Sequence, residues 1–193
     1  GSHYTGASTF LAIAIARGDV GKALLFVGLT AAFVAGATAS GLLIRDYHLK
    51  LGRRYGVALM AESVLVALAF VAYADDPTVT VFLLAFACGL QNAMATTYSG
   101  AVVRTTHLTG ILTDLGTQLA KLLVGNRVDR RRVFLFLSIV TGFVSGGVLS
   151  ASLFPVIGRY TLFIVVFLTG GTGLAYYIYR EFLAPKRDSL TRD

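Results

Sequence analysis

The chain has 193 residues, of which 55% are hydrophobic and only 14% are charged. A soluble domain carries about 25% charged residues, so this composition excludes an ordinary soluble globular protein and indicates a membrane protein. The net charge of +7 does not indicate nucleic-acid binding, because the basic residues lie in short segments between apolar stretches. Cys88 is the single cysteine, so no disulfide can form within the chain.

Apolar stretches of helical length follow one another along the chain. The first, residues 7–17, is too short to cross a hydrocarbon core of about 30 Å, which takes about 20 residues. Leucine and isoleucine recur over residues 108–123 at the spacing of an amphipathic helix, whose other faces carry Thr109, Thr113, Thr117, Gln118 and Lys121. The sequence therefore predicts an all-α transmembrane bundle, one membrane domain over residues 1–193, with spans at residues 22–44, 55–73, 78–94, 133–154 and 160–183.

Two polar motifs in this apolar chain match each other. The pattern His-x-Thr-Gly at residues 3–6 returns at residues 107–110, 104 positions later. Residues 33–36 and 143–146 also match, but 110 positions apart. An ordered series of this kind predicts an internal duplication. The change of offset predicts an insertion, which we place in the basic loop around residues 127–132.

Loop charges predict how the two repeats lie in the membrane. The loops at residues 45–54 and 124–132 and the tail at 184–193 are basic and are expected on the cytoplasmic side, whereas Asp75 and Asp76 mark an external turn. Each repeat then has three crossings and one short re-entrant or interfacial helix. Because an odd number of crossings turns the second copy upside down, we expect inverted repeats.

The two repeats are assigned to residues 1–74 and 77–183. The second begins with a span that precedes its motif, whereas the first begins at the motif itself. We therefore expect a further span before Ser2.

The second motif and its surroundings resemble a known family. Residues 89–93, which read Gly-Leu-Gln-Asn-Ala, are followed by the motif at residues 104–110 and by Thr-Asp-Leu-Gly at residues 113–116. This combination resembles the YoaK family of small bacterial inner-membrane proteins (DUF1275), and residues 2–9 resemble its first-half motif. The resemblance implies a multi-pass protein of the bacterial inner membrane. It implies no activity, since the family's function is unassigned.

Polar groups at hydrocarbon depth are costly unless they are partnered or hydrated, so the two motifs are the candidate solute site. The amino end of the helix at Leu108 offers free N–H groups and a partial positive charge, and Arg104 adds a full charge. This combination suits an anionic or strongly polar solute. The predicted solute-binding residues are His3, Thr5, Gly6, Ser8, Gln91, Asn92, Arg104, Thr105, Thr106, His107, Thr109 and Gly110.

Two carboxylates are candidates for proton coupling. Glu62 lies about 12 Å along its helix from Arg54, at 1.5 Å per residue, and Asp114 lies one turn beyond Gly110. A structural alternative stands beside each assignment: Glu62 bonded to a neighbouring helix, and Asp114 paired with Arg104 or a lysine.

Other polar residues have structural alternatives too. Gln91 and Asn92 are equally suited to holding helices together. His107 suits a structural donor, and Arg104 suits a contact with lipid phosphates. The helix at 108–123 also suits an amphipathic linker in the headgroup region.

These features favour a secondary transporter of a small polar solute, with an anion preferred, that works by alternating access and is open to proton coupling. The alternatives are a channel of the same symmetry and a non-transporting structural or partner-binding membrane protein. No catalytic motif or metal-ligand cluster appears in the sequence, so we expect neither an enzyme nor a cofactor. The expected partners are the lipid bilayer and the solute, and a homo-oligomer is compatible with the sequence.

Overall fold

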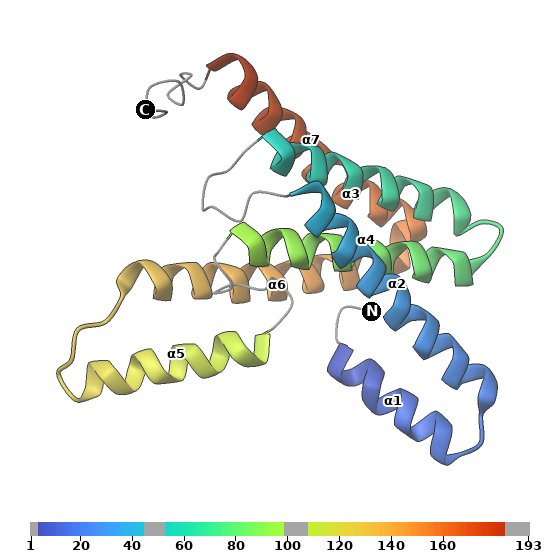
Figure 1. Cartoon of the computed structure of the whole chain (residues 1–193), viewed down its shortest axis with the longest axis horizontal. Helices are drawn as coiled ribbons and strands as arrows, with labels where there is room; N and C mark the ends of the chain where they lie inside the picture. The colour runs from blue at the N-terminus through green and yellow to red at the C-terminus, as the bar shows by residue number, and fades with distance from the viewer. Residues whose placement is uncertain (1–3, 45–52, 99–107, 184–193) are drawn as a thin grey trace.

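The computed structural model describes residues 4–44, 53–98 and 108–183, and over these ranges the chain is helical (Figure 1). The all-α fold class is thereby confirmed. The helices are α1 (Tyr4–Ala16), α2 (Val20–Leu43), α3 (Arg53–Ala72), α4 (Pro77–Tyr98), α5 (Leu108–Leu123), α6 (Arg130–Ile157) and α7 (Leu162–Ile178), with the short turns η1 (Gly158–Thr161) and η2 (Tyr179–Leu183).

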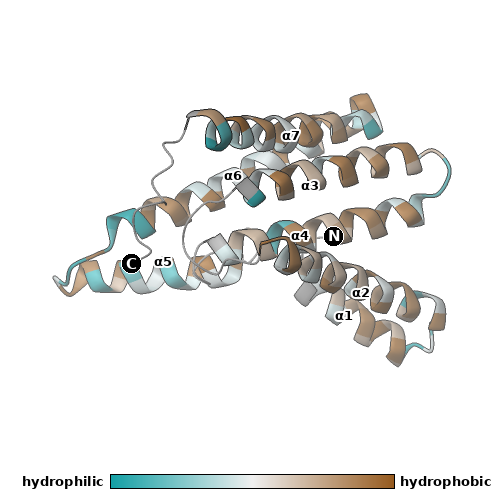
Figure 2. Ribbon diagram, turned by 45° about the horizontal axis from the view of Figure 1, so that its top comes forward, coloured by the Kyte–Doolittle hydropathy of each residue, from teal (hydrophilic) through white to brown (hydrophobic). Residues whose placement is uncertain are grey.

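Four stretches are long and apolar enough to cross a membrane: Val20–Leu43, Arg54–Ala72, Pro77–Thr97 and Arg130–Phe182. The last one contains α6, η1 and α7, and the chain reverses direction at η1 (Figure 1), where Gly158 ends α6 with a φ of 54°. Large apolar side chains such as Phe134, Val148 and Phe167 point outward. Apolar colour runs along these helices (Figure 2), as hydrocarbon contact requires.

Most helix bounds agree closely with the sequence prediction, and α5 covers the predicted residues 108–123. The main difference is α4, which continues past the predicted end at Met94 to Tyr98. No glycine or proline follows Met94 within the helix, and the hydroxyls of Thr96 and Thr97 bond back to the carbonyl oxygens of Asn92 and Ala93. Both polar residues Gln91 and Asn92 therefore lie inside a helix rather than at its end.

Helix α4 packs against α2 on one side and α3 on another, and α3 also packs against α7 (Figure 1). Ala58, Leu59, Leu90 and Met94 form the buried cluster between α3 and α4. Glycines bring other helices into backbone contact: a Cβ at Gly36 of α2 would overlap the carbonyl oxygen of Phe86 in α4. Small residues therefore set the closest approaches in this bundle.

The contact between α3 and α7 is antiparallel and reciprocal. A Cβ at Gly56 would lie 2.8 Å from the carbonyl oxygen of Gly173, and a Cβ at Gly173 would lie 2.9 Å from that of Gly56. Towards the other end of the pair, the ring of Phe70 lies 4.4 Å from that of Phe163, measured between centroids.

The short helices α1 and α5 each fold back on the long helix that follows. Phe10 stacks on Phe26 between α1 and α2, with ring centroids 5.9 Å apart. Ile111 of α5 is buried against the fully buried Phe136 of α6.

The two turns that connect these helix pairs use the same hydrogen bonds. After α1, the N–H of Gly18 donates to Ile15 and that of Asp19 to Ala14; after α5, the N–H of Gly125 donates to Leu122 and that of Asn126 to Lys121. Both glycines have positive φ, 69° and 75°. An aspartate then caps each long helix: Asp19 accepts from the N–H of Lys22, and Asp129 from that of Arg132.

Matching points in the two pairs of helices show where the extra residues of the second pair lie. In the described residues α1 has 13 residues and α5 has 16. The glycines at their ends are 107 positions apart, and the capping aspartates are 110 apart. The sequence comparison placed the whole change of offset in the basic loop, whereas half of that change falls before Gly125, where α5 is longer than α1 by about one turn.

Candidate functional site

A buried carboxyl group lies between α3 and α4. Glu62 is 4% exposed, and the side-chain amide of Gln91 donates to its Oε1 at 2.9 Å. Its Oε2 is buried without a hydrogen-bond partner. An ionisable side chain at this depth of an apolar helix is a functional candidate on physical grounds, because its charged form is expensive there.

The sequence of α3 places Glu62 on a face that is small and apolar. Ala58, Val66 and Ala69 are buried on the same side as Glu62, at the spacing that keeps residues on one face of a helix. The neighbouring Ser63 points to α7 instead, where its hydroxyl donates to the carbonyl oxygen of Val166 at 2.9 Å. Glu62 therefore occupies the α4 side of a helix that is also fixed to α7.

Both polar residues predicted in α4 make helix contacts. Gln91 donates a hydrogen bond to Glu62. Asn92, which is buried, donates to the carbonyl oxygen of Cys88 in its own helix at 2.9 Å. This bond agrees with the structural alternatives given above, a Glu62 carboxylate bonded to a neighbouring helix and a Gln91 that holds helices together, but the pairing of these two residues was not predicted. A signal was present: the two residues lie at similar distances on either side of the turn at Asp75 and Asp76, so an antiparallel hairpin puts them at one depth.

The short helices that carry the two motifs have their amino ends directed toward the middle of the molecule and their carboxyl ends directed away from it (Figures 1 and 2). Gly6 and Ser8 lie in the first turns of α1, and Thr109 and Gly110 in the first turn of α5. Ser8 and Thr109 are exposed, as is Asp114 farther along α5. Asp114 and Glu62 thus lie in quite different surroundings.

Several predicted site residues cannot be placed. His3, Arg104, Thr105, Thr106 and His107 lie outside the described residues, and Thr5 is described only as part of the α1 backbone.

Two buried polar atoms were not expected from the sequence. Ser40 of α2 is fully buried with its hydroxyl oxygen unpartnered. Gln118 of α5, which helical periodicity put on a polar face, is buried as well, and its Oε1 has no partner. Gln118 lies about two helical turns after Ile111 and therefore on the same side of α5. It is buried because that side faces α6.

The ranges 4–44, 53–98 and 108–183 contain no group of three or more histidine, cysteine, aspartate or glutamate side chains that could hold a metal ion.

Comparison with models of known protein families identifies a family. A model of the family described as "Protein of unknown function (DUF1275)" matches residues 1–175. The chain belongs to the DUF1275 family. No curated protein and no solved structure matches it significantly. The resemblance noted in the sequence is therefore confirmed at the level of this family, whose description names no activity.

Proposed function

We propose that this DUF1275 protein is a secondary transporter of a small polar solute, working by alternating access, with Glu62 coupling transport to protons. The observation that carries the proposal is the buried Glu62 carboxyl group with one oxygen bonded to Gln91 and the other unpartnered. Packing alone would favour an apolar residue there, because a buried charge costs more than it returns when no cation accompanies it. Glu62 is explained if its carboxyl group accepts and releases a proton as the helices separate.

Inverted repeats supply the movement that such a mechanism needs. In this proposal α1 to α3 correspond to α5 to α7. The shared hydrogen bonds at Gly18 and Gly125 and at Asp19 and Asp129 support that correspondence. The pair formed by α3 and α7 is antiparallel and meets through Gly56 and Gly173, as expected of equivalent helices on a two-fold axis in the membrane plane. Rocking of one repeat against the other would open the α3–α4 contact alternately to the two sides.

The orientation that we propose follows charge. Arg54, Arg130 and Arg180 belong to the helix ends that lie on the left in Figures 1 and 2, and the turn of Asp75 and Asp76 lies on the right. We infer that the basic end and the C-terminal tail face the cytoplasm, in the inner membrane of a bacterium.

The solute that we propose is an anion or a strongly polar molecule. The amino ends of α1 and α5 are both directed toward the middle of the molecule (Figures 1 and 2). Free N–H groups at helix amino ends favour negative charge. Helix α5 packs along α6, which supports a re-entrant helix over a linker lying flat in the headgroup region. We propose no enzymatic activity.

The test uses the purified chain in liposomes that contain a pH-sensitive dye. Phosphate, acetate, lactate and glycine are added outside in turn, and proton and solute uptake are followed. We expect one or more of these solutes to drive coupled uptake. Glu62→Gln, which keeps the side-chain volume, should retain solute exchange and lose proton movement. Arg104→Ala should abolish anion uptake, and the exposed Asp75→Asn serves as the control.

Three results would contradict the proposal. One is the absence of solute-dependent flux across the panel, and another is unchanged proton movement in Glu62→Gln. Electrical conductance without any coupled proton movement would favour the channel instead.

A further inference from the structure

Small residues recur at every fourth position on one side of both α2 and α6. In α2 the positions are Gly28, Ala32, Gly36 and Ser40; 110 positions later in α6 they are Ser138, Gly142, Gly146 and Ser150. Residues four apart lie on one side of a helix, and a side made of small residues permits close backbone contact with another helix. We refer to these two sets as the small-residue stripes.

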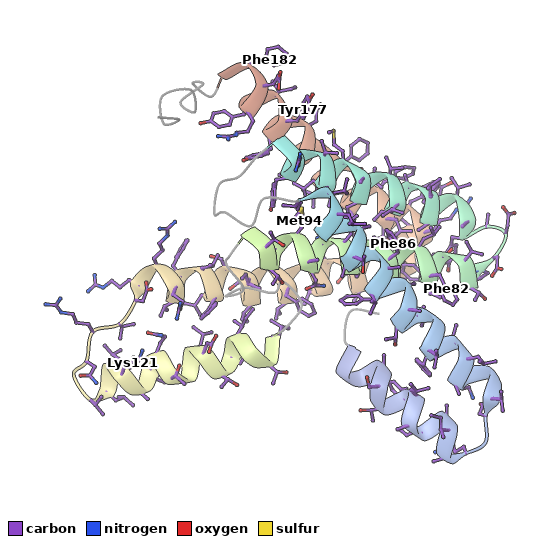
Figure 3. The ribbon with its side chains drawn as sticks, in the orientation of Figure 1. Phe82, Phe86, Met94, Lys121, Tyr177 and Phe182 are labelled. Atoms are coloured by element: carbon purple, nitrogen blue, oxygen red, sulfur yellow. The ribbon has the colours of Figure 1, made fainter. Side chains whose placement is uncertain are left out.

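The stripe of α2 is filled by α4. A Cβ at Gly28 would lie 2.8 Å from the ring of Phe82, and a Cβ at Gly36 would overlap the carbonyl oxygen of Phe86. The contact is reciprocal, since a Cβ at Gly89 of α4 would overlap the carbonyl oxygen of Phe33. Figure 3 shows Phe82 and Phe86 along α4, beside α2. This stripe is therefore a surface for binding a helix.

The matching stripe of α6 is open. A Cβ at Gly142 or Gly146 would meet no atom within 4 Å, and Ser138 and Ser150 are exposed. Phe136 is the buried residue of α6, and it packs against α5.

We propose that the stripe of α6 binds a transmembrane helix of the α4 kind. The reason is that the stripe of α6 corresponds, position by position, to the stripe of α2, and the helix that binds the α2 stripe is α4. The occupant should be apolar, run parallel to α6 and carry a glycine opposite Gly146, as Gly89 lies opposite Gly36. This inference rests on the duplication and not on transport, so it can fail while the proposed function stands.

Self-association through Gly142 and Gly146 is the rival, because two glycines four apart also suit a helix dimer. The α2 stripe argues against self-association. It has the same spacing and contacts a different helix, α4, whose phenylalanines lie over its glycines.

The test adds a synthetic peptide of residues 77–98 to the full chain in detergent micelles. The peptide stands in for the proposed helix, and the photoreactive analogue benzoylphenylalanine replaces Phe86. We expect crosslinks to α6 within residues 133–157. Gly146→Ala in the chain should weaken peptide binding about tenfold. Gly147→Ala is the matched control, because the equivalent residue in α2 is already Ala37 and the bound α4 tolerates it.

Folding does not confound this comparison, because a Cβ at Gly146 or Gly147 meets open space in the chain alone, and circular dichroism checks that both variants keep their helices. Binding that is insensitive to Gly146→Ala, or crosslinks confined to other helices, would overturn the proposal. A dimer of the chain that dissociates in Gly146→Ala would also overturn it, by assigning the stripe to a second copy.

Discussion

The pair α1–α2 and the pair α5–α6 are built alike but packed differently. Each short helix ends in a glycine of positive φ, and each long helix starts at a capping aspartate. Yet Gly36 of α2 touches α4, whereas Gly146 of α6 faces open space. The hydrogen bonds of a turn join residues within a few positions of each other, so they form whatever lies nearby. Contacts between helices depend on which partner is present.

Disrupting the contact of Gly36 with α4, which has no counterpart at Gly146, should have the largest effect on stability. Gly36→Leu forces a side chain into the backbone of α4, and we expect the free energy of unfolding to fall by about 3 kcal/mol or more. Gly146→Leu should change it little, because the added atoms meet no neighbour in the chain. Unfolding in mixed micelles with increasing dodecyl sulfate, followed by circular dichroism, measures both. Equal losses would mean that the two stripes do not differ as described.

The shared turns should respond equally to loss of their glycines. Gly18→Ala and Gly125→Ala each place a Cβ on a residue with positive φ, which should cost about 1 kcal/mol. The control is Gly116→Ala inside α5, where the added methyl group meets open space and should stabilise the helix by about 0.5 to 1 kcal/mol. Thermal unfolding provides the measurement. A cost at one turn and none at the other would argue against a common turn structure.

Acid should weaken the caps, with the smallest effect of the three. The pKa of Asp19 lies below the ordinary value of 3.8, mainly because the side chain of Lys22 donates a hydrogen bond to it and, to a lesser extent, because the backbone N–H of Lys22 does so. Hydrogen bonds from Thr78 lower the pKa of Asp76 in the same way. Because these pKa values are lowered by folding, the stabilisation is present at neutral pH. It is lost as pH falls through the lowered values.

Carboxyl carbon NMR measures this titration directly. We expect the resonances of Asp19 and Asp76 to titrate below that of a model peptide, and Asp19→Asn should remove the part of the acid sensitivity that belongs to the α1–α2 turn. The effect is small because both groups are exposed and screened by solvent. An ordinary pKa at either residue would mean that its cap bond does not persist in solution.

Prediction from sequence succeeded where the physics is local or concerns the bilayer. Runs of about 20 apolar residues located the long apolar helices, because backbone polar groups in hydrocarbon must bond within a helix, and leucine spacing located α5. It failed for Gln118, a polar residue that lies on the same side of α5 as Ile111 and is buried there. It also failed to show where the offset between the two helix pairs changes, since a helix one turn longer and a longer loop change the offset in the same way.

The candidate site was found in pieces rather than as a unit. Glu62 stood out as a carboxylate in an apolar helix, and Gln91 as an amide in another. Their 2.9 Å hydrogen bond depends on α3 and α4 packing at one depth and rotation, and no residue in either helix specifies that rotation alone.

By itself the sequence determined that this is a chain of helices, several of them long and apolar enough to cross a membrane, with polar groups at a few definite positions. Hydrophobicity and short-range hydrogen bonds suffice for that, because both act within a segment. Only the tertiary structure decided that Glu62 meets Gln91, and that one small-residue stripe is filled while its counterpart is open. These contacts join residues far apart in the chain, and their energies depend on which surfaces come together.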